Sequence, residues 1–263
     1  MNNVLHRSIS ALGAFSLGPI EGFGKFVVFN FETLRRTFYP PVSLILLIRQ
    51  LEFVGNRSFA VIVLAGVMVG GIFGFQLGEI FRIFGAESMM GAAAAYTLSR
   101  EMAPVVGAFL VAGRAGSAMA AEIAIMRVNE QIDAMGVMAV NPYNYLIAPR
   151  VLASLIMMPL LTSIFVISGV FTSFIVGINF YDVDVGRFIE RISWVVEPND
   201  VFQGLQKAVV FGLILSTISC YKGFFATGGA KGVGQATTSS VVASFVLILV
   251  SDFLITYLQY KFS

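Results

Sequence analysis

Four charged side chains lie in segments that are otherwise too apolar to hold them. Arg100 and Glu101 interrupt one long hydrophobic segment, Lys207 lies near the start of another, and Asp252 lies within the last. An ionisable residue inside a membrane costs about 2.5–3.5 kcal/mol on insertion scales, so such residues pair or line a polar cavity. Two interpretations follow: a salt bridge that only fixes helix packing, or a polar patch where Arg100 or Lys207 contacts a phosphate.

The order of these charges along the chain predicts their partners. Adjacent residues on a helix point about 100° apart, so Arg100 and Glu101 need not face the same partner. We expect Glu101 to bridge to Lys207. Asp252 lies away from the motifs around these two residues, and we expect it to cap or bond within the bundle or to lie near an interface. Arg49, in LLIRQL, is a further candidate for the cavity edge. Pro104 removes one backbone hydrogen bond and should bend its helix directly after the charged pair.

Several kinds of chemistry are excluded by composition. With one cysteine, Cys220, and one histidine, His6, the chain can form neither an intramolecular disulfide nor a four-ligand His/Cys metal site. The run Gly228–Gly234 lacks the Gly-Lys-Ser/Thr order of a phosphate-binding loop, and no GxSxG or HExxH motif is present. A net charge of +2 does not suggest nucleic acid. We therefore expect no catalytic residues, cofactor or metal, and energy supplied by another subunit or by a gradient.

The elements that carry these charges are predicted to be membrane-spanning helices. Hydrophobic residues make up 57% of the chain and charged residues only 12%, against about 25% charged in soluble domains. A crossing needs roughly 20 residues. We predict an all-α integral membrane protein with an N-terminal interfacial segment, residues 1–41, and a membrane domain, residues 42–263. The membrane domain begins with a shallow or re-entrant elbow at residues 42–48. Five segments are predicted to cross the membrane: 58–78, 88–112, 151–181, 204–221 and 241–260.

The first of these spans carries glycines on one helical face. Gly66, Gly70, Gly74 and Gly78 recur at every fourth position. Such a face lets another helix or a ligand tail approach the backbone closely. Gly70 and Gly74 are therefore candidates to line a lipid groove, with ordinary packing between helices as the equal alternative.

A polar stretch, residues 113–150, separates the second and third spans. Within it, about 115–137 is predicted to form one amphipathic helix that ends before Asn141-Pro142, with an apolar stripe at Ala118, Ala121, Ile125, Val128, Ile132 and Met135. Its other side carries Glu122, Arg127, Glu130 and Asp133. The helix is either a solvated connection or a docking surface. Lys and Arg mark the cytoplasmic side of membrane proteins, and their distribution here predicts a cytoplasmic N-terminus and a cytoplasmic 113–150 stretch.

Three blocks of the sequence resemble a known family. They are GRAGSAMAAEIAIMRVNEQIDAM followed by NPYNYLIAPRVLA, then LSREMAPVVGAFLVAGR at 98–114, and GGAKGVGQATTSSVV at 228–242. These blocks closely resemble the signature of MlaE-type permeases, the membrane subunits of bacterial Mla and Mce lipid-transport ABC systems, which have relatives in chloroplasts. The resemblance covers roughly residues 42–260.

The resemblance implies roles for the candidate residues. The 115–137 helix would be the coupling helix that docks on an ATPase, with Glu122, Arg127, Glu130 and Asp133 at or beside the contact. The blocks around Arg100, Glu101 and Lys207 would line a lipid pocket. The implied function is a permease that moves phospholipid between the bacterial inner membrane and the periplasm or outer membrane. The implied partners are an MlaF-like ATP-binding subunit, a second copy of the chain, an MlaD-like Mce-domain subunit and a small MlaB-like STAS subunit.

Two other functions stay open on sequence grounds. A gradient-driven transporter would use Glu101 or Asp252 as its proton site and would work without an ATPase. A membrane scaffold would only recruit a soluble protein through residues 113–150, and would tolerate loss of Glu101 or Lys207. An intramembrane enzyme ranks behind both, because no catalytic motif is present.

Overall fold

The computed structural model describes residues 22, 24–37 and 43–262, and all regular elements in these ranges are helices. Five helical runs are long and apolar enough to cross a membrane: Leu44–Ile83, Glu87–Val128, Tyr143–Tyr181, Pro198–Phe224 and Gly229–Lys261. Each contains one of the five predicted spans. The predicted all-α membrane fold with five spans is therefore confirmed.

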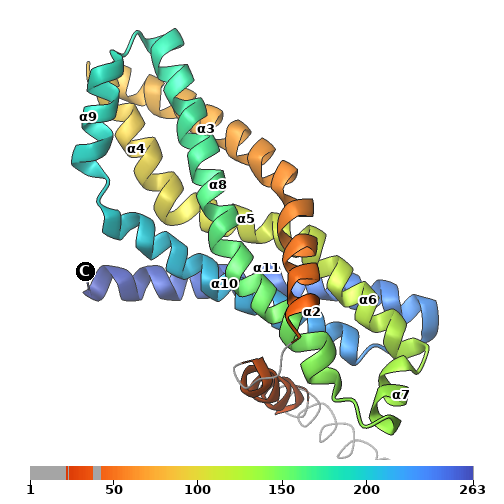
Figure 1. Cartoon of the computed structure of the whole chain (residues 1–263). Helices are drawn as coiled ribbons and strands as arrows, with labels where there is room; N and C mark the ends of the chain where they lie inside the picture. The colour runs from red at the N-terminus through yellow and green to blue at the C-terminus, as the bar shows by residue number, and fades with distance from the viewer. Residues whose placement is uncertain (1–21, 23, 38–42, 263) are drawn as a thin grey trace, which may run out of the picture.

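The first run joins the predicted elbow to the first span without a break. Helix α2 (Leu44–Leu51) continues through a π-helical turn (Glu52–Asn56) into α3 (Arg57–Ile83), and Figure 1 shows this run bending near its start. The elbow is thus the first part of a 40-residue helical run. A separate short element was expected because Arg49 and Glu52 interrupt the apolar pattern.

The glycine face of α3 packs on α8 (Ala148–Tyr181). A Cβ placed on Gly70 would lie 2.1 Å from the carbonyl oxygen of Gly169, and one on Gly74 would lie 3.1 Å from the Val176 Cβ. Contacts this close leave room only for hydrogen on α3, which is how small residues let membrane helices approach. Gly70 and Gly74 therefore lie in the contact between two helices, which is the packing alternative that the sequence left open.

The second run is the longest and bends at its charged pair. It comprises a 3₁₀ turn and then α4 (Met90–Thr97), a π-helical turn (Leu98–Met102), α5 (Ala103–Val111), a second π-helical turn (Ala112–Gly116) and α6 (Ser117–Val128). At the first π-helical turn, the Ala103 amide donates to the Leu98 carbonyl, one residue farther back than in an α-helix. Pro104 follows at once and offers no amide hydrogen. The predicted bend lies between α4 and α5 (Figure 1).

The polar stretch does not form the single helix predicted over 115–137. Helix α6 is the direct continuation of the second span, and the chain then turns at Asn129 and Glu130, whose φ is +57°, before the short helix α7 (Gln131–Val137). The predicted stripe is not the face by which α6 packs on its neighbours, because Ile125 is 48% exposed. The buried face consists instead of Met119, Ala120, Ile123 and Ala124. Its small residues allow close packing between helices, a property that hydrophobic periodicity does not register.

Helix α6 packs between the last two spans, α10 (Pro198–Phe224) and α11 (Gly229–Phe262). At the far end of the molecule, a further helix, α9 (Val185–Val195), packs on α4. The Asp184 carboxylate caps α9 by accepting from the Arg187 amide, 3.0 Å away. The segment 182–203, which joins the predicted third and fourth spans, therefore holds an ordered helix that lies opposite α7 along the bundle (Figure 1).

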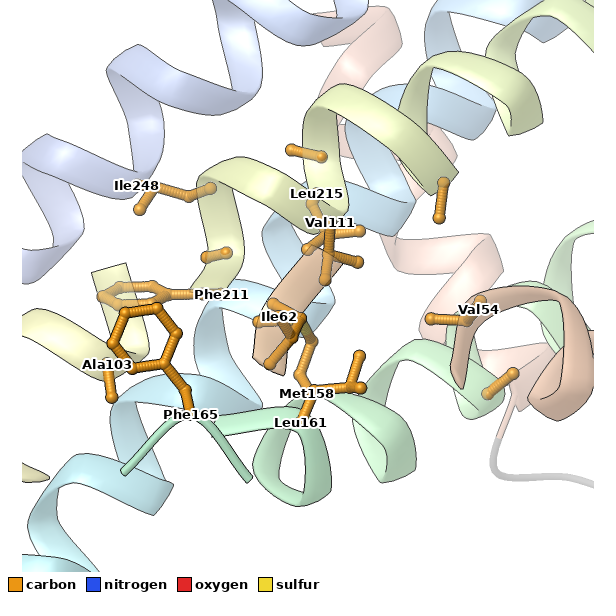
Figure 2. Close-up of a cluster of buried hydrophobic side chains, with 14 of the residues drawn as sticks. Val54, Ile62, Ala103, Val111, Met158, Leu161, Phe165, Phe211, Leu215 and Ile248 are labelled. Atoms are coloured by element: carbon orange, nitrogen blue, oxygen red, sulfur yellow. The ribbon is translucent and has the colours of Figure 1, made fainter. Parts of the chain in front are cut away.

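The bundle is held by one apolar core shared among its long helices. Figure 2 shows this core, in which α3, α5, α8, α10 and α11 contribute Ile62, Val111, Phe165, Phe211 and Ile248. A second cluster holds the N-terminal helix, residues 24–37. Its Phe29 is 1% exposed and packs among the rings of Tyr143, Tyr221 and Phe224. The rest of the predicted interfacial segment, residues 1–21, 23 and 38–41, lies outside the described residues.

Candidate functional site

The charged residues meet where α10 crosses the first bend of the second run. Gly204 makes this crossing close, since a Cβ on it would lie 2.0 Å from the Ser99 carbonyl oxygen. Lys207 lies about one helical turn beyond Gly204, and Glu101 lies two residues beyond Ser99. A glycine at the crossing thus brings a lysine of one helix within reach of a carboxylate on the other.

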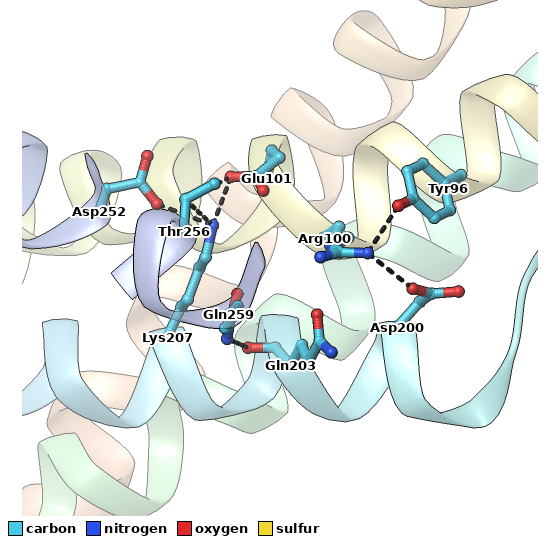
Figure 3. Close-up of polar contacts among 9 residues, drawn as sticks. All are labelled: Tyr96, Arg100, Glu101, Asp200, Gln203, Lys207, Asp252, Thr256 and Gln259. Carbon is cyan, nitrogen blue, oxygen red and sulfur yellow. Dashed lines mark hydrogen bonds and ion pairs between the residues drawn. The ribbon is translucent and has the colours of Figure 1, made fainter. Parts of the chain in front are cut away.

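Lys207 forms the centre of a buried polar cluster. Its side chain is fully buried, and its ammonium forms an ion pair with Glu101 and another with Asp252, whose Oδ1 is 3.1 Å from Nζ. The same Nζ donates to the Thr256 hydroxyl at 2.7 Å. Figure 3 shows these contacts, which join the second, fourth and fifth runs. We call Glu101, Lys207, Asp252 and Thr256 the Lys207 cluster.

The cluster confirms one sequence prediction and identifies the partner of a second residue. The bridge between Glu101 and Lys207 is present as predicted. Asp252 was expected to bond within the bundle, and it does so as the second carboxylate on Lys207, a partner that the sequence did not identify. It lies 45 positions after Lys207, and no local pattern links the two. The pairing could have been inferred from the free-energy cost of an unpaired carboxylate inside a membrane, because sharing the Lys207 ammonium avoids that cost for Asp252.

Arg100 forms a second polar contact on the other side of the same turn. Its Nη1 donates to the Tyr96 hydroxyl at 2.6 Å and to Asp200 Oδ1 at 3.1 Å. The other carboxylate oxygen of Asp200 accepts from the Glu197 amide and caps the start of α10. Arg100 and Glu101 therefore diverge to different partners, as their helical spacing predicts (Figure 3). Asp200 was not predicted here, because its residue type and position fitted a solvated loop.

Lys207 and Arg100 differ in how many of their hydrogen-bond donors remain available to a ligand. An ammonium has three hydrogen-bond donors, and Lys207 contacts three acceptors. A guanidinium has five, and both contacts of Arg100 use Nη1. The side chains of Glu101 and Asp252 are 32% and 21% exposed, so the cluster is open on its carboxylate side. Arg100 can thus take a further anionic ligand more readily than Lys207 can.

Arg49 does not join this site. It lies exposed on α2, and it takes part in none of the polar contacts of the Lys207 cluster or of Arg100. A place for Arg49 at the cavity edge stays a prediction.

The four predicted coupling residues gather at the opposite end, around the turn between α6 and α7. Arg127 pairs with Asp133 across this turn, and Glu130 lies exposed at its tip. Glu122 is held differently: its carboxylate is 2.9 Å from Arg150 Nη2. Arg150 is 6% exposed, and its Nη1 donates to the Leu146 carbonyl. Sequence patterns had placed Arg150 in a loop, although it is a buried anchor between α6 and α8.

A family model described as Permease MlaE matches residues 47–258, which is most of the chain. The chain belongs to the MlaE permease family. Among its relatives, a probable ABC transporter permease protein of Rickettsia felis is 41% identical over 252 residues, covering 96% of this chain and 97% of the relative. The protein TRIGALACTOSYLDIACYLGLYCEROL 1, chloroplastic, of Arabidopsis thaliana is 39% identical over 80% of this chain and 60% of its own length.

A third relative carries a more specific description. The intermembrane phospholipid transport system permease protein MlaE of Haemophilus influenzae is 36% identical over 219 residues, covering 82% of this chain and 83% of the relative. Together with the five spans, these relatives establish a multi-pass membrane protein that is a permease subunit of the ABC transporter type. Membership of this MlaE family implies an ATPase partner.

Proposed function

We propose that this permease moves phospholipid between the inner membrane and the periplasm or outer membrane, driven by a separate ATPase subunit. The observation that carries the proposal is the Lys207 cluster, a buried group of charges on three membrane-spanning runs beside Arg100. Charged residues inside membrane helices are costly, and they usually mark the pathway of a substrate or ion. The name of the Haemophilus relative supports phospholipid as the substrate class.

Within this proposal, Arg100 is the residue that contacts the lipid phosphate. Its side chain is 15% exposed and retains donors beyond Nη1. A guanidinium matches phosphate geometry, because its fixed fork of donors can form two parallel hydrogen bonds. Glu101, Lys207 and Asp252 have a positioning role. They hold the bent second run, α10 and α11 together beside Arg100, where the headgroup would bind.

The ATPase would bind at the turn between α6 and α7. Glu130 and Asp133 are its most accessible charges, while Arg127 holds the turn together and Glu122 is tied to Arg150. Since α6 belongs to the same helical run as Arg100 and Glu101, a displacement at this turn would reach the polar cluster along one continuous helix. We place this end in the cytoplasm, with the N-terminus, in the bacterial inner membrane.

The remaining partners follow from the same proposal. ABC transporters pair two ATPase subunits with two membrane halves, so a second copy of this chain would complete the pathway. An MlaD-like Mce-domain subunit and a small MlaB-like STAS subunit would complete the complex. The chain itself would supply no ATP hydrolysis, because its sequence lacks a phosphate-binding loop.

The test of the proposal is ATP-driven phospholipid transfer by the purified complex. The chain is co-purified with its ATPase, its bound lipid is extracted and identified, and transfer between vesicles is followed with a fluorescent phospholipid. We expect bound phospholipid and ATP-dependent transfer, both lost in Arg100→Gln. Lys222→Gln, a substitution near the end of α10 and away from the cluster, is the matched control and should transfer normally. A complex that binds no phospholipid would contradict the proposal.

The same preparation separates the two alternatives. Transfer by the chain alone, driven by a pH gradient without any ATPase, would establish a gradient-driven transporter. A scaffold would retain full function after Glu101→Ala and Lys207→Ala. For the docking site, reversing both Glu130 and Asp133 to Lys should abolish co-purification of the ATPase. The reversal Glu190→Lys, on α9 at the opposite end of the bundle, should leave co-purification intact.

A further inference from the structure

Two buried amide oxygens beside the Lys207 cluster lack a hydrogen-bond donor. Gln203, between Asp200 and Lys207 on α10, is 8% exposed, and its Oε1 has no donor among the described residues. Gln259 lies on α11 three residues after Thr256, and its Oε1 is buried in the same condition. The Gln259 amide is oriented by its Nε2, which donates to the Gln203 carbonyl at 3.2 Å. A buried acceptor without a donor is costly, so both positions fit a ligand that brings donors.

The two amides belong to the same site as the ion pairs. Gln203 precedes Lys207 by four residues, so the two share one face of α10. Gln259 follows Asp252 by seven residues, about two turns, so these two share one face of α11. Figure 3 shows Gln203 between Lys207 and Arg100. The amide oxygens and the carboxylates of the cluster therefore form one group of acceptors, and Arg100, which retains donors, lies beside it.

Acidic side chains outnumber basic ones in these ion pairs. The two cations are Arg100 and Lys207, and their partners are the three carboxylates of Glu101, Asp200 and Asp252. Arg100 pairs with Asp200, so Glu101 and Asp252 share the single charge of Lys207. A carboxylate without a cation of its own is costly inside a membrane. A cationic group would therefore bind beside these two carboxylates more favourably than an anionic one.

We propose that Glu101, Asp252 and the two amide oxygens bind a primary ammonium, so that the permease prefers a phospholipid with an ethanolamine headgroup. The inference rests on the proposed function, in which Arg100 contacts the lipid phosphate. A primary ammonium has three donors, which match acceptors that lack one. Because Gln203 lies between Arg100 and Lys207, a headgroup with its phosphate at Arg100 would place its ammonium beside the cluster. The two carboxylates then bind the lipid as well as positioning the helices.

The chemistry of the site disfavours three other ligand groups. A choline headgroup carries a quaternary ammonium, which has no N–H donor and would leave both amide oxygens without one. A glycerol headgroup leaves the phospholipid anionic and brings no cation to the two carboxylates. A divalent metal ion needs a shell of oxygen ligands, but the Lys207 ammonium already occupies the position that both carboxylates face. Among the described residues, no group of three or more His, Cys, Asp or Glu could hold a metal ion.

A competition series with identical acyl chains tests the inference. The purified complex of the chain with its ATPase is incubated in detergent with a fluorescent phospholipid. This probe is then displaced by phosphatidylethanolamine, phosphatidylcholine or phosphatidylglycerol. We expect phosphatidylethanolamine to displace it at a concentration about ten-fold lower than either of the others, the difference expected for one hydrogen bond to a charged group.

Two variants assign the preference to named residues. Gln203→Met removes a buried acceptor and should lower the preference for phosphatidylethanolamine over phosphatidylcholine several-fold, with phosphatidylcholine binding unchanged. Gln206→Met, at an exposed position three residues along the same helix, is the matched control and should keep the preference. Asp252→Asn neutralises one of the two carboxylates on Lys207 and should shift the preference about ten-fold from phosphatidylethanolamine towards phosphatidylglycerol. Because phosphatidylglycerol binding is retained in this variant, misfolding would not give the same result.

The contrary outcomes are distinct from one another. Equal affinity for the three lipids would overturn the ammonium site and leave the proposed function standing. Equal binding of phosphatidylethanolamine and phosphatidylcholine, both above phosphatidylglycerol, would overturn the role of the amide oxygens, because charge alone would then select the lipid. A preference that persists in both Gln203→Met and Asp252→Asn would place the ammonium elsewhere. A complex that binds none of the three lipids would overturn the ammonium site and the proposed function together.

Discussion

Replacing Lys207 with Met is the sharpest test of how the polar cluster works. The substitution keeps the length of the buried side chain and removes its charge, leaving Glu101 and Asp252 facing each other without a cation. Removing one partner of a buried ion pair costs about 3–5 kcal/mol. Both carboxylates are partly exposed here and can relax, so we expect the low end, about 3 kcal/mol. At this chain length that corresponds to a fall in Tm of roughly 6–12 °C.

Two assays are used: thermal unfolding of the purified chain in nanodiscs, and ATP-driven lipid transfer by the complex of the chain with its ATPase. Lys222→Met, on the same helix but outside the cluster, is the control and should leave Tm unchanged. Adding Glu101→Gln and Asp252→Asn to Lys207→Met removes all three charges and should restore most of the lost Tm, because replacing a whole buried ion pair is often neutral. Transfer should stay low in the triple variant. If the Tm of Lys207→Met is no lower than that of Lys222→Met, then the loss of the cation between Glu101 and Asp252 does not destabilise the protein, and this reasoning is wrong.

Three further predictions address the surrounding structure. Gly70→Ala should sharply lower the yield of folded protein in detergent, because its Cβ would lie 2.1 Å from a backbone oxygen of α8. The control Gly71→Ala should purify normally, because its Cβ would lie 3.4 Å from Thr172, an ordinary contact distance. Arg150→Met should lower Tm, because Glu122 loses its ion pair and the Leu146 carbonyl loses its hydrogen bond from the buried guanidinium. A Tm equal to that of the wild type would mean that the pair of Arg150 and Glu122 is solvated. Pro104→Ala should restore a backbone donor, straighten the bend and slow ATP-driven lipid transfer with Tm maintained or raised; an unchanged transfer rate would show that the bend does not shape the cavity.

Much of the fold could be predicted because it depends on local properties of the chain. The length of each apolar segment sets the number of spans, and Pro104 fixes the position of a bend. The bridge from Glu101 to Lys207 was predictable because a buried charge needs a partner and few are available. The face of α6 was missed, because alanine and glycine pack helices closely while contributing little to a hydrophobic stripe.

The partners Asp200, Asp252 and Arg150 could not be predicted for a different reason. Each contacts a residue far away in the sequence, and the pair Arg100 and Asp200 is separated by 100 positions. Nothing near Asp200 distinguishes it from other acidic residues in a loop, except that Glu197 three residues earlier forms a capping box with it. That pattern indicates a helix start and hence a carboxylate fixed in place. It does not indicate which cation lies opposite.

The polar cluster and the bend in the second run depend on each other physically. Backbone groups inside a membrane must be satisfied within the protein, so an irregular turn is tolerated there only where it is buried or lines a cavity. The turn Leu98–Met102 meets this condition because Gly204 lets α10 cover it. The extra residue of this turn changes the angular position of Arg100 and Glu101 relative to α5. Because the two side chains point in different directions, Arg100 pairs with Asp200 and Glu101 pairs with Lys207, on one face of α10. A straight helix would alter both contacts together, so any motion that reaches this turn through α6 must act on the two ion pairs at once.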